Sequence, residues 1–351
     1  MTALLQLLDQ VRAAISDSEP LCIVGGNSKR HLGREPAGSP IEVANYAGVV
    51  EYEATELVVT VRAGTTVRDL REILAEENQM LACDPPEFDG NATIGGTLAC
   101  SQSGPSRPWH GSIRDHVLGV RLINGKGEHL RFGGQVMKNV AGYDVSRLQA
   151  GAMGTYGLLT EVSLKVLPKP ESSMTVRRRL DANEAIRAMN EISMKPTPLT
   201  GACWHDGDMY LRLSGPGAVV EAAASGFEGE LLADRAAFWT ALRDQASPFF
   251  ESARDLWRFS VRPNSPHSKP QNDWLIDWGG AQRWLTGQHE SDELENIAAK
   301  SGGEVTRSRG GDRKAEGLPS LSGSKRALLT RMKQAFDPAG VFNPGRLYSW
   351  M

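Results

Sequence analysis

The chain has 351 residues, 40% of them hydrophobic, and a formal net charge of −3, which is typical of a globular protein with two domains. The chain has 39 basic and 42 acidic residues, and the basic ones are not concentrated in a stripe. This argues against nucleic acid as a partner and against a polybasic segment that anchors the chain to a membrane. No run approaches about 18 apolar residues, so we expect no direct membrane span.

The N-terminal segment predicts an amphipathic helix rather than a secretion signal, because Asp9 and Arg12 interrupt its apolar residues and a basic start is missing. The cysteines are far apart and form no Cys-x-x-Cys pair: Cys22, Cys83, Cys100 and Cys203. We therefore expect no metal site and no iron–sulfur cluster, and we expect a reducing, cytoplasmic compartment.

The region up to Pro170 is rich in predicted strands. Short β-branched runs indicate strands at 21–24, 48–52 and 57–62. Thr66 and Asp69 have the spacing of a helix start, and the helix extends to Asn78. The alternating run 158–167 predicts a strand that ends at the prolines.

A hairpin is predicted between the runs 117–123 and 128–132. They flank Asn124-Gly125, a dipeptide suited to the positive φ angles of a tight turn.

Beyond Pro170 the order strand, helix, strand, strand, helix predicts an antiparallel sheet with helices on one face. The segments are 174–180, 181–192, 200–205, 209–214 and 217–224. We expect further strands at 256–261 and 274–278, and a helix at 321–335 before a turn-rich tail. Six of the eight tryptophans lie between Trp204 and Trp284, so this region is rich in aromatic residues, whereas the first is rich in glycine.

The stretch from Asn91 to Gly104 combines adjacent glycines, small side chains and hydroxyls with almost no charge. Glycine lets main-chain N–H groups approach anionic oxygens, and the hydroxyls add donors, so a loop that binds a phosphate-bearing or large flat ligand is the first hypothesis. A flexible surface loop is the alternative, but Ile94 and Leu98 within the stretch disfavour it.

Two other glycine-containing segments allow two interpretations each. Residues 23–29 follow a predicted strand. Their N–H groups could bind a pyrophosphate, or the segment could be a structural turn. Residues 151–157 carry three glycines that permit close approach to a ring system or form a plain turn. In the segment 138–144, Tyr143 faces a ligand or anchors the loop.

Other familiar chemistries receive little support. Gly215-x-Gly217 imitates a dinucleotide fingerprint, but Val220 replaces its third glycine, which favours an ordinary strand–turn–helix corner. The run 205–208 offers a histidine and two carboxylates, yet Asp206-Gly207 between two strands favours a hairpin turn over a metal site.

In their order along the chain, these motifs resemble the FAD-binding domain of the vanillyl-alcohol oxidase and p-cresol methylhydroxylase (PCMH) superfamily, from about Pro20 to Pro170. Within that superfamily the chain looks most like the FAD-binding subunits of bacterial glycolate oxidases. The motifs that carry the resemblance are Asp84-Pro-Pro86, Ala92–Thr97, Ser103–Arg107, Arg114–Gly119, Lys138–Asp144 and Asn343-Pro-Gly345.

The resemblance implies an α+β fold in three parts. A two-part PCMH-type FAD-binding domain would cover 1–170, and an antiparallel-sheet α+β cap domain would cover 171–320. The C-terminal helix and tail, 321–351, would return to the FAD domain.

For the cofactor, the resemblance places 23–29 and 93–97 around the pyrophosphate of FAD, and 101–104 and 111–115 beside ribityl and flavin. The residues that it implies are Val24, Gly25, Gly26, Asn27, Ser28, Lys29, Pro85, Thr93, Ile94, Gly95, Gly96, Thr97, Ser101, Ser103, Gly104, Gly111, Ser112, Arg114, Asp115 and Leu159. Some relatives bind the flavin covalently through a histidine at the position of Asn27, so we expect noncovalent FAD here.

The resemblance also implies oxidation of glycolate or a similar 2-hydroxy acid such as D-lactate to the 2-oxo acid. Arginine suits the substrate carboxylate because its fork binds both oxygens, and Arg258, Arg262 and Arg283 are candidates, with surface or packing roles as the alternative. The implied partners are a larger FAD-binding subunit and an iron–sulfur subunit, in a complex that sits peripherally at the inner membrane.

Two departures from the pattern keep other functions open. A histidine- and acid-rich cap motif of related D-lactate and glycolate flavoenzymes is missing, and Met153 stands where many relatives have an acid. One alternative is a self-sufficient FAD-dependent 2-hydroxy-acid oxidoreductase. The other is a structural or electron-relay FAD-binding subunit without its own substrate site.

Overall fold

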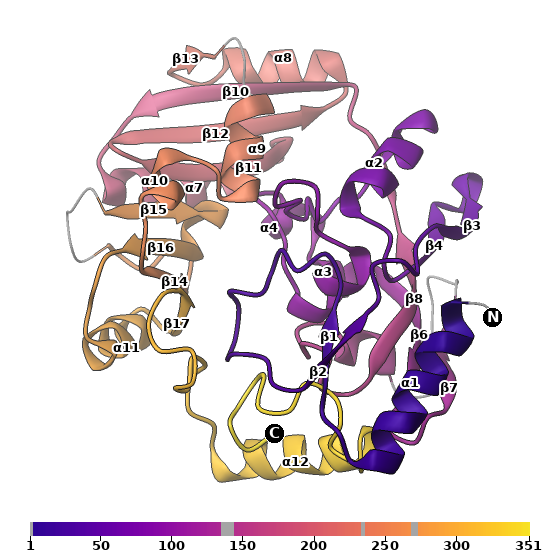
Figure 1. Cartoon of the computed structure of the whole chain (residues 1–351). Coiled ribbons are helices and arrows are strands. Elements are labelled where there is room, and N and C mark those ends of the chain that lie inside the picture. The colour runs from indigo at the N-terminus through magenta and orange to yellow at the C-terminus, as the bar shows by residue number, and fades with distance from the viewer. Residues whose placement is uncertain (1–2, 135–143, 233–235, 268–272) are drawn as a thin grey trace. The chain divides into compact units, whose positions relative to one another are not determined.

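The computed structural model describes residues 3–134, 144–232, 236–267 and 273–351 (Figure 1). The chain forms two compact units. The first unit comprises Met1–Gln102, Ser112–Pro168 and Asp312–Met351, and the second comprises Ser103–Gly111 and Lys169–Gly311. The three functional domains remain a prediction, and the compact units differ from them by assigning 103–111 and 169–170 to the second unit and 312–320 to the first.

A five-stranded antiparallel sheet forms the centre of the first unit, in the order β3-β4-β8-β6-β7. Its strands are β3 (Val49–Glu53), β4 (Val58–Arg62), β6 (Val117–Ile123), β7 (His129–Gly133) and β8 (Leu158–Lys165). The strand predicted at 158–167 is confirmed as the central strand as far as Lys165, with Leu158, Val162 and Leu164 fully buried.

The predicted hairpin of β6 and β7 is confirmed, but the prediction of its turn is wrong. Ile123 pairs with His129, so the connection is longer than two residues, and the Asn124 N–H donates to the Glu128 carbonyl. The Asn124 side chain accepts from the N–H groups of Lys126 and Glu128, which stabilises the longer loop. The positive φ angle falls on Gly127 instead of Asn124-Gly125.

The helices of the first unit pack around this sheet. They are α1 (Ala3–Asp17), α2 (Val67–Glu76), α3 (Ile94–Cys100), α5 (Ile113–His116), α6 (Val145–Leu148), α12 (Gly323–Phe336) and the 3-10 turn η1 (Ala54–Glu56). The predicted start of α2 is confirmed, because the Thr66 side chain accepts the Asp69 N–H at 3.0 Å. The amphipathic N-terminal helix is confirmed too, with Leu7, Leu8 and Val11 buried.

Helix α3 corrects the expectation of a loop at 91–104. Thr93 caps it, and Ile94 and Leu98 are fully buried one turn apart, which makes the segment helical despite two glycines. The helix ends at Ser101 in the left-handed conformation.

Two small strand pairs complete the first unit. Strands β1 (Leu21–Val24) and β2 (Ser39–Glu42) pair in parallel, and β5 (Gln79–Met80) and β9 (Leu167–Pro168) pair antiparallel. The C-terminal tail joins the first pair through a parallel bridge between Leu21 and Phe342. This bridge ties the end of the chain to the beginning of β1.

An eight-stranded antiparallel sheet organises the second unit, in the order β13-β10-β12-β11-β15-β16-β14-β17. Its strands are β10 (Ser172–Arg179), β11 (Leu199–His205), β12 (Asp208–Gly215), β13 (Glu230–Leu231), β14 (Leu256–Ser260), β15 (Trp274–Asp277), β16 (Gln282–Thr286) and β17 (Glu304–Arg309). The predicted antiparallel α+β fold is confirmed.

Helices cover both faces of this sheet, whereas the sequence predicted one. The helices are α4 (Arg107–His110), α7 (Ala182–Ser193), α8 (Gly217–Ser225), α9 (Ala236–Asp244), α10 (Pro248–Glu251), α11 (Ser291–Lys300) and the turn η2 (Trp278–Gly280). Trp204 packs with α7 and α8 residues, while the preceding Cys203 packs with Trp239 of α9 and Phe250 of α10. Since neighbouring strand residues point to opposite faces, α9 and α10 lie on the second face.

The cap and the turns that the sequence predicts in the second unit are confirmed. Asp181 and Glu184 form the capping box of α7. Asp206-Gly207 forms a turn with positive φ angles between β11 and β12, as the hairpin interpretation predicted. The run 215–217 is the corner from β12 to α8.

Candidate functional site

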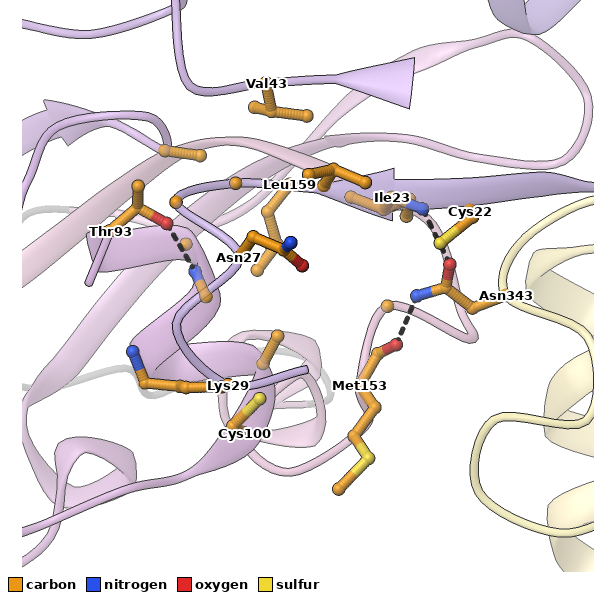
Figure 2. A pocket seen from close by; sticks show the side chains of 18 of the residues that line it. Cys22, Ile23, Asn27, Lys29, Val43, Thr93, Cys100, Met153, Leu159 and Asn343 are labelled. Atoms are coloured by element: carbon orange, nitrogen blue, oxygen red, sulfur yellow. Dashed lines mark hydrogen bonds between the residues drawn. The ribbon is translucent and has the colours of Figure 1, made fainter. Parts of the chain in front are cut away.

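A pocket of about 910 Å³, part of it open to solvent, lies in the first unit (Figure 2). Four segments supply most of its lining: residues 22–30 from β1 and the turn after it, residues 93–100 around α3, residues 153–159 at the start of β8, and the C-terminal tail. Segments that are far apart in the sequence therefore meet around one pocket.

Glycine is required where residues 25 and 26 cross the segment before α3. A Cβ on Gly26 would lie 1.5 Å from the Asn91 carbonyl oxygen, and one on Gly25 would lie 2.6 Å from the Thr93 hydroxyl oxygen. Neither position leaves room for a side chain. The chain turns here through Asn27, which has a φ of 56° and whose carboxamide lies in the open part of the view in Figure 2.

The loop that follows β1 presents unused main-chain donors. Among the residues that the structure describes, the N–H groups of residues 25–29 have no hydrogen-bond acceptor. Buried main-chain N–H groups in a folded protein are nearly always paired, and those that lack a protein acceptor bond to water or to a ligand. Consecutive free donors along a pocket wall form the kind of concavity that binds anions.

In the first turn of α3, by contrast, the main-chain N–H groups already have acceptors within the protein. The N–H groups of Ile94 and Gly95 donate to the carbonyls of Thr65 and Ala63, and the Gly96 N–H donates to the Thr93 hydroxyl at 3.2 Å. These are the donors that the sequence assigned to an anion, and the protein itself already uses them. Gly95 and Gly96 instead contribute a wall without side chains; a Cβ on Gly95 would lie 2.7 Å from that of Ala63.

Lys29 brings a positive charge to the pocket. Its side chain is buried, and burial lowers its pKa to about 8. Burial also raises the pKa of the neighbouring Cys100 thiol, with Lys29 acting in the opposite direction. Figure 2 shows both side chains at the same end of the pocket.

The tail closes another side of the pocket through Asn343. Its carboxamide oxygen accepts the Ile23 N–H at 2.7 Å, and its nitrogen donates to the Met153 carbonyl at 2.6 Å (Figure 2). Arg346 lies behind Lys29 and Arg30, with its guanidinium donating to their carbonyls at 3.4 and 3.2 Å. One side chain from the tail thus joins β1 to the loop before β8.

The pocket brings together about half of the predicted cofactor residues. Those that line it are Val24, Gly25, Gly26, Asn27, Ser28, Lys29, Thr93, Gly95, Gly96 and Leu159. Ile94 and Thr97 are buried on other sides of α3, and Pro85 is buried outside the lining. Ser101 is the C-cap of α3 and does not line the pocket either.

The remaining predicted residues lie elsewhere in the fold. Ser112 and Asp115 form the capping box of α5, with Asp115 accepting from the Ser112 N–H and hydroxyl at 2.8 Å each, and Arg114 on the same helix is exposed. Ser103, Gly104 and Gly111 belong to the second unit. Residues 138–143 of the resemblance motif 138–144, Tyr143 among them, lie outside the described residues.

Sequence reasoning missed several lining residues. These are Cys22, Arg30, Pro36, Val43, Ala63, Ala99, Cys100, Met153, Gly154, Gly157, Asn343 and Arg346. The glycines of 151–157 and the Asn343-Pro-Gly345 motif were signals for some of them. Small apolar residues such as Val43 and Ala63 carry no signal of their own.

In the second unit, the three candidate arginines differ in their surroundings. Arg283 is buried, and its guanidinium donates to the carbonyls of Gly280, Pro266 and Ser265 at 2.5 to 3.3 Å, which is a packing role. Arg262 is exposed.

Arg258 is half-buried over the Trp278 ring, 5.3 Å from its centroid. Its Nε donates to the Gln282 side chain at 2.7 Å, and Arg107 lies over the same ring at 4.4 Å. Burial, together with the smaller effect of the Arg107 charge, lowers the pKa of Arg258 to about 10. Two guanidinium groups on one ring form a cationic cluster.

The described residues contain no group of three or more histidine, cysteine or acidic side chains that could hold a metal ion. No helix among them is long and apolar enough to cross a membrane.

Comparison with known proteins adds a family to this geometry. The model of the FAD binding domain matches residues 4–133. Over 343 residues, the chain is 46% identical to the glycolate oxidase subunit GlcE of Escherichia coli (strain K12), which covers 98% of this chain and 97% of that protein. The chain belongs to the GlcE family of glycolate oxidase subunits. As a GlcE-family protein it is an FAD-dependent oxidoreductase, and its cofactor is FAD.

More distant relatives share only part of the GlcE-family chain. The glycolate oxidase subunit GlcD of Bacillus subtilis (strain 168) is 33% identical over 36% of this chain and 27% of its own length. A D-lactate dehydrogenase of Anaerostipes hadrus is 30% identical over 40% of this chain and 29% of its own length. The solved structure of alkyldihydroxyacetonephosphate synthase matches 96% of this chain and 74% of its own with a TM-score of 0.66 and 16% identity, which supports the fold.

Proposed function

We propose that this chain is the FAD-binding subunit of a complex that oxidises glycolate, or a similar 2-hydroxy acid such as D-lactate, to the 2-oxo acid. The unused N–H groups of residues 25–29 carry the proposal, because they line a pocket in a chain whose cofactor is FAD. The names of its GlcE and D-lactate dehydrogenase relatives support the substrate class.

The pocket residues fit FAD in their chemistry. The N–H groups of 25–29 and the Lys29 ammonium would bind the diphosphate, and the side-chain-free wall of Gly95 and Gly96 would let the cofactor approach the backbone. Leu159, which lines the same pocket, would lie beside the isoalloxazine, as the resemblance implies. Because Asn27 cannot form the covalent bond of a histidine, the FAD would be noncovalent, and acid denaturation should release all of the yellow colour.

The reaction removes two electrons and two protons from the hydroxy acid. FAD, when bound, accepts the electron pair together with the α-hydrogen, and the hydroxyl proton passes to a base. For the substrate carboxylate we propose Arg258, since its Nε bond to Gln282 leaves other N–H donors of its fork available. Arg283 is a poorer candidate because main-chain carbonyls accept its hydrogen bonds.

The electrons would then leave through partner subunits. The relatives' names describe separate glycolate oxidase subunits, GlcE and GlcD, which supports a complex. We propose a larger FAD-binding subunit and an iron–sulfur subunit as partners, in the cytoplasm and peripherally at the inner membrane through the complex. The four cysteines are free thiols, which agrees with a reducing compartment.

Anaerobic reduction tests this function. The FAD-loaded chain, alone and in the assembled complex, is mixed with glycolate, D-lactate and L-lactate, and the loss of flavin absorbance is followed. We expect reduction of this chain's flavin in the complex. Flavin that stays oxidised in both preparations would favour the relay subunit, and steady turnover by the isolated chain would favour the self-sufficient oxidoreductase.

Substitution of Arg258, the proposed partner of the substrate carboxylate, makes the same test more specific. Arg258→Gln should slow reduction at low substrate concentration by about tenfold or more, because it removes charge-assisted hydrogen bonds to the carboxylate. Arg262→Gln, at an exposed position, is the matched control. Equal rates for the two variants would exclude Arg258 from substrate binding.

A further inference from the structure

Lys29 is a buried cation that lacks an anionic partner within the described chain. The residue is 6% exposed. Its ammonium has only two neighbouring partners there: the Ser28 hydroxyl at 3.5 Å and the face of the Phe88 ring at 5.4 Å. Burial of an ammonium group without a counter-charge is costly, so the site favours an anion that the chain itself does not supply.

Among the described residues, the titratable groups that face Lys29 supply no negative charge at neutral pH. From α3 comes the Cys100 thiol, whose pKa is raised by burial. From the tail comes Arg346, a second cation, and Arg30 is the next residue in the chain. His31 packs edge-on against Phe88, the ring that also faces Lys29.

Lys29 also lies next to the main-chain N–H groups that have no acceptor. Its own N–H is the last of the five between residues 25 and 29, so the charge and the donors belong to one turn of the chain on one pocket wall. Main-chain donors orient phosphate oxygens, and a lysine adds a full charge that main-chain dipoles lack.

We propose that Lys29 is a proton-coupled phosphate site: its ammonium form binds the diphosphate of FAD, and the protein takes up a proton when the cofactor binds at mildly alkaline pH. The inference rests on the proposed position of FAD in this pocket. It adds a titrating group to that position and links retention of the cofactor to pH.

The direction of the effect follows from the charges. In the free protein the pKa of Lys29 is about 8, lowered by burial. A bound diphosphate stabilises the ammonium form and raises this pKa. Between the two pKa values the complex holds more protons than the free protein, so FAD affinity falls as pH rises through 8, by about tenfold from pH 7 to pH 9.

Titration of the FAD-free full-length chain tests the proposal. Calorimetry at pH 7 and pH 9, in buffers of different ionisation enthalpy, gives both the affinity for FAD and the number of protons taken up. We expect a tenfold loss of affinity and proton uptake approaching one at pH 9. Riboflavin lacks the diphosphate, so its binding should show neither effect.

Two variants separate charge from titration. Lys29→Arg keeps the charge but does not titrate in this range, so it should bind FAD equally at both pH values. Lys29→Met should bind FAD more weakly at pH 7, with no proton uptake. It should also raise the melting temperature of the FAD-free protein, because it removes an unpaired buried charge; this readout verifies that the variant folds.

Failure of the inference is distinct from failure of the proposed FAD position. Gly26→Ala tests the position, since its Cβ would enter the Asn91 carbonyl. If Gly26→Ala abolishes FAD binding but Lys29→Met keeps the wild-type pH dependence, the proton coupling is wrong and the pocket stands. If a folded Gly26→Ala protein binds FAD normally, the position itself is wrong, and the coupling with it.

Discussion

Two buried lysines of the first unit, Lys29 in the pocket and Lys333 in the C-terminal clasp, lie in opposite surroundings. By C-terminal clasp we mean residues 333–343. The ammonium of Lys333 donates to the Thr155 carbonyl, the Phe342 carbonyl and the Asp337 carboxylate at 2.7 to 2.8 Å. Each of its three protons therefore has an acceptor. Lys29 has one hydroxyl at the limit of hydrogen-bond distance.

The clasp is complete within the chain. Asp337, which is fully buried, also accepts the N–H groups of Val341 and Phe342, so the network fixes the tail that continues into Asn343. The pocket loop has the same kinds of groups, N–H donors and a lysine, without their acceptors. A satisfied buried network stabilises the fold, whereas an unsatisfied one indicates a ligand.

The largest effect is expected from breaking the clasp. Lys333→Met leaves the Asp337 carboxylate buried without its counter-charge, which should lower the free energy of unfolding by about 3 to 5 kcal/mol. Urea denaturation of the FAD-free protein measures this. Lys325→Met, at an exposed position of the same helix, should change it by less than about 0.5 kcal/mol.

The two lysine substitutions should change the free energy of unfolding in opposite directions, which tests the comparison directly. Lys333→Met should destabilise the FAD-free protein while Lys29→Met stabilises it. If both substitutions destabilise to a similar degree, Lys29 has a structural partner and the contrast is wrong.

The next effect concerns the loop itself. Gly26→Ala should reduce FAD affinity by at least about a hundredfold, because the Cβ would lie 1.5 Å from a main-chain oxygen and the loop must move. Fluorescence titration with FAD measures the loss, and circular dichroism checks the fold. Gly317→Ala is the matched control, since no heavy atom lies within 4 Å of its Cβ. Similar losses in both variants would contradict the close approach at Gly26.

Local features of this fold could be predicted from the sequence. The caps at Thr66 and Asp181 lie within three residues of the groups they bond, so spacing alone reveals them. The strand predicted at 158–167 could be recognised in the same way, because alternation also relates residues that are close in sequence. Strand β16, by contrast, is buried at four consecutive residues in the middle of a sheet, so it shows no alternation.

The candidate site was predictable in its chemistry and less so in its assembly. Glycines at 25–26 and 95–96 indicated close approach of the backbone, and both pairs line the pocket. Which N–H groups remain unused depends on tertiary partners such as Thr65 and Ala63, and composition does not contain that information. Asn343 bonds to Ile23 across 320 residues of sequence, beyond any local pattern.

The smallest effect is expected where the clasp meets the pocket. Asn343→Ala removes the acceptor of the Ile23 N–H and the donor to Met153, which loosens the end of β1 without adding a clash. FAD affinity should fall about fivefold to tenfold, in line with the loss of one or two hydrogen bonds. Ser324→Ala, exposed on α12, is the control and should leave the affinity unchanged. An Asn343→Ala protein with wild-type affinity would show that the pocket keeps its shape without the tail, and the clasp would then serve stability alone.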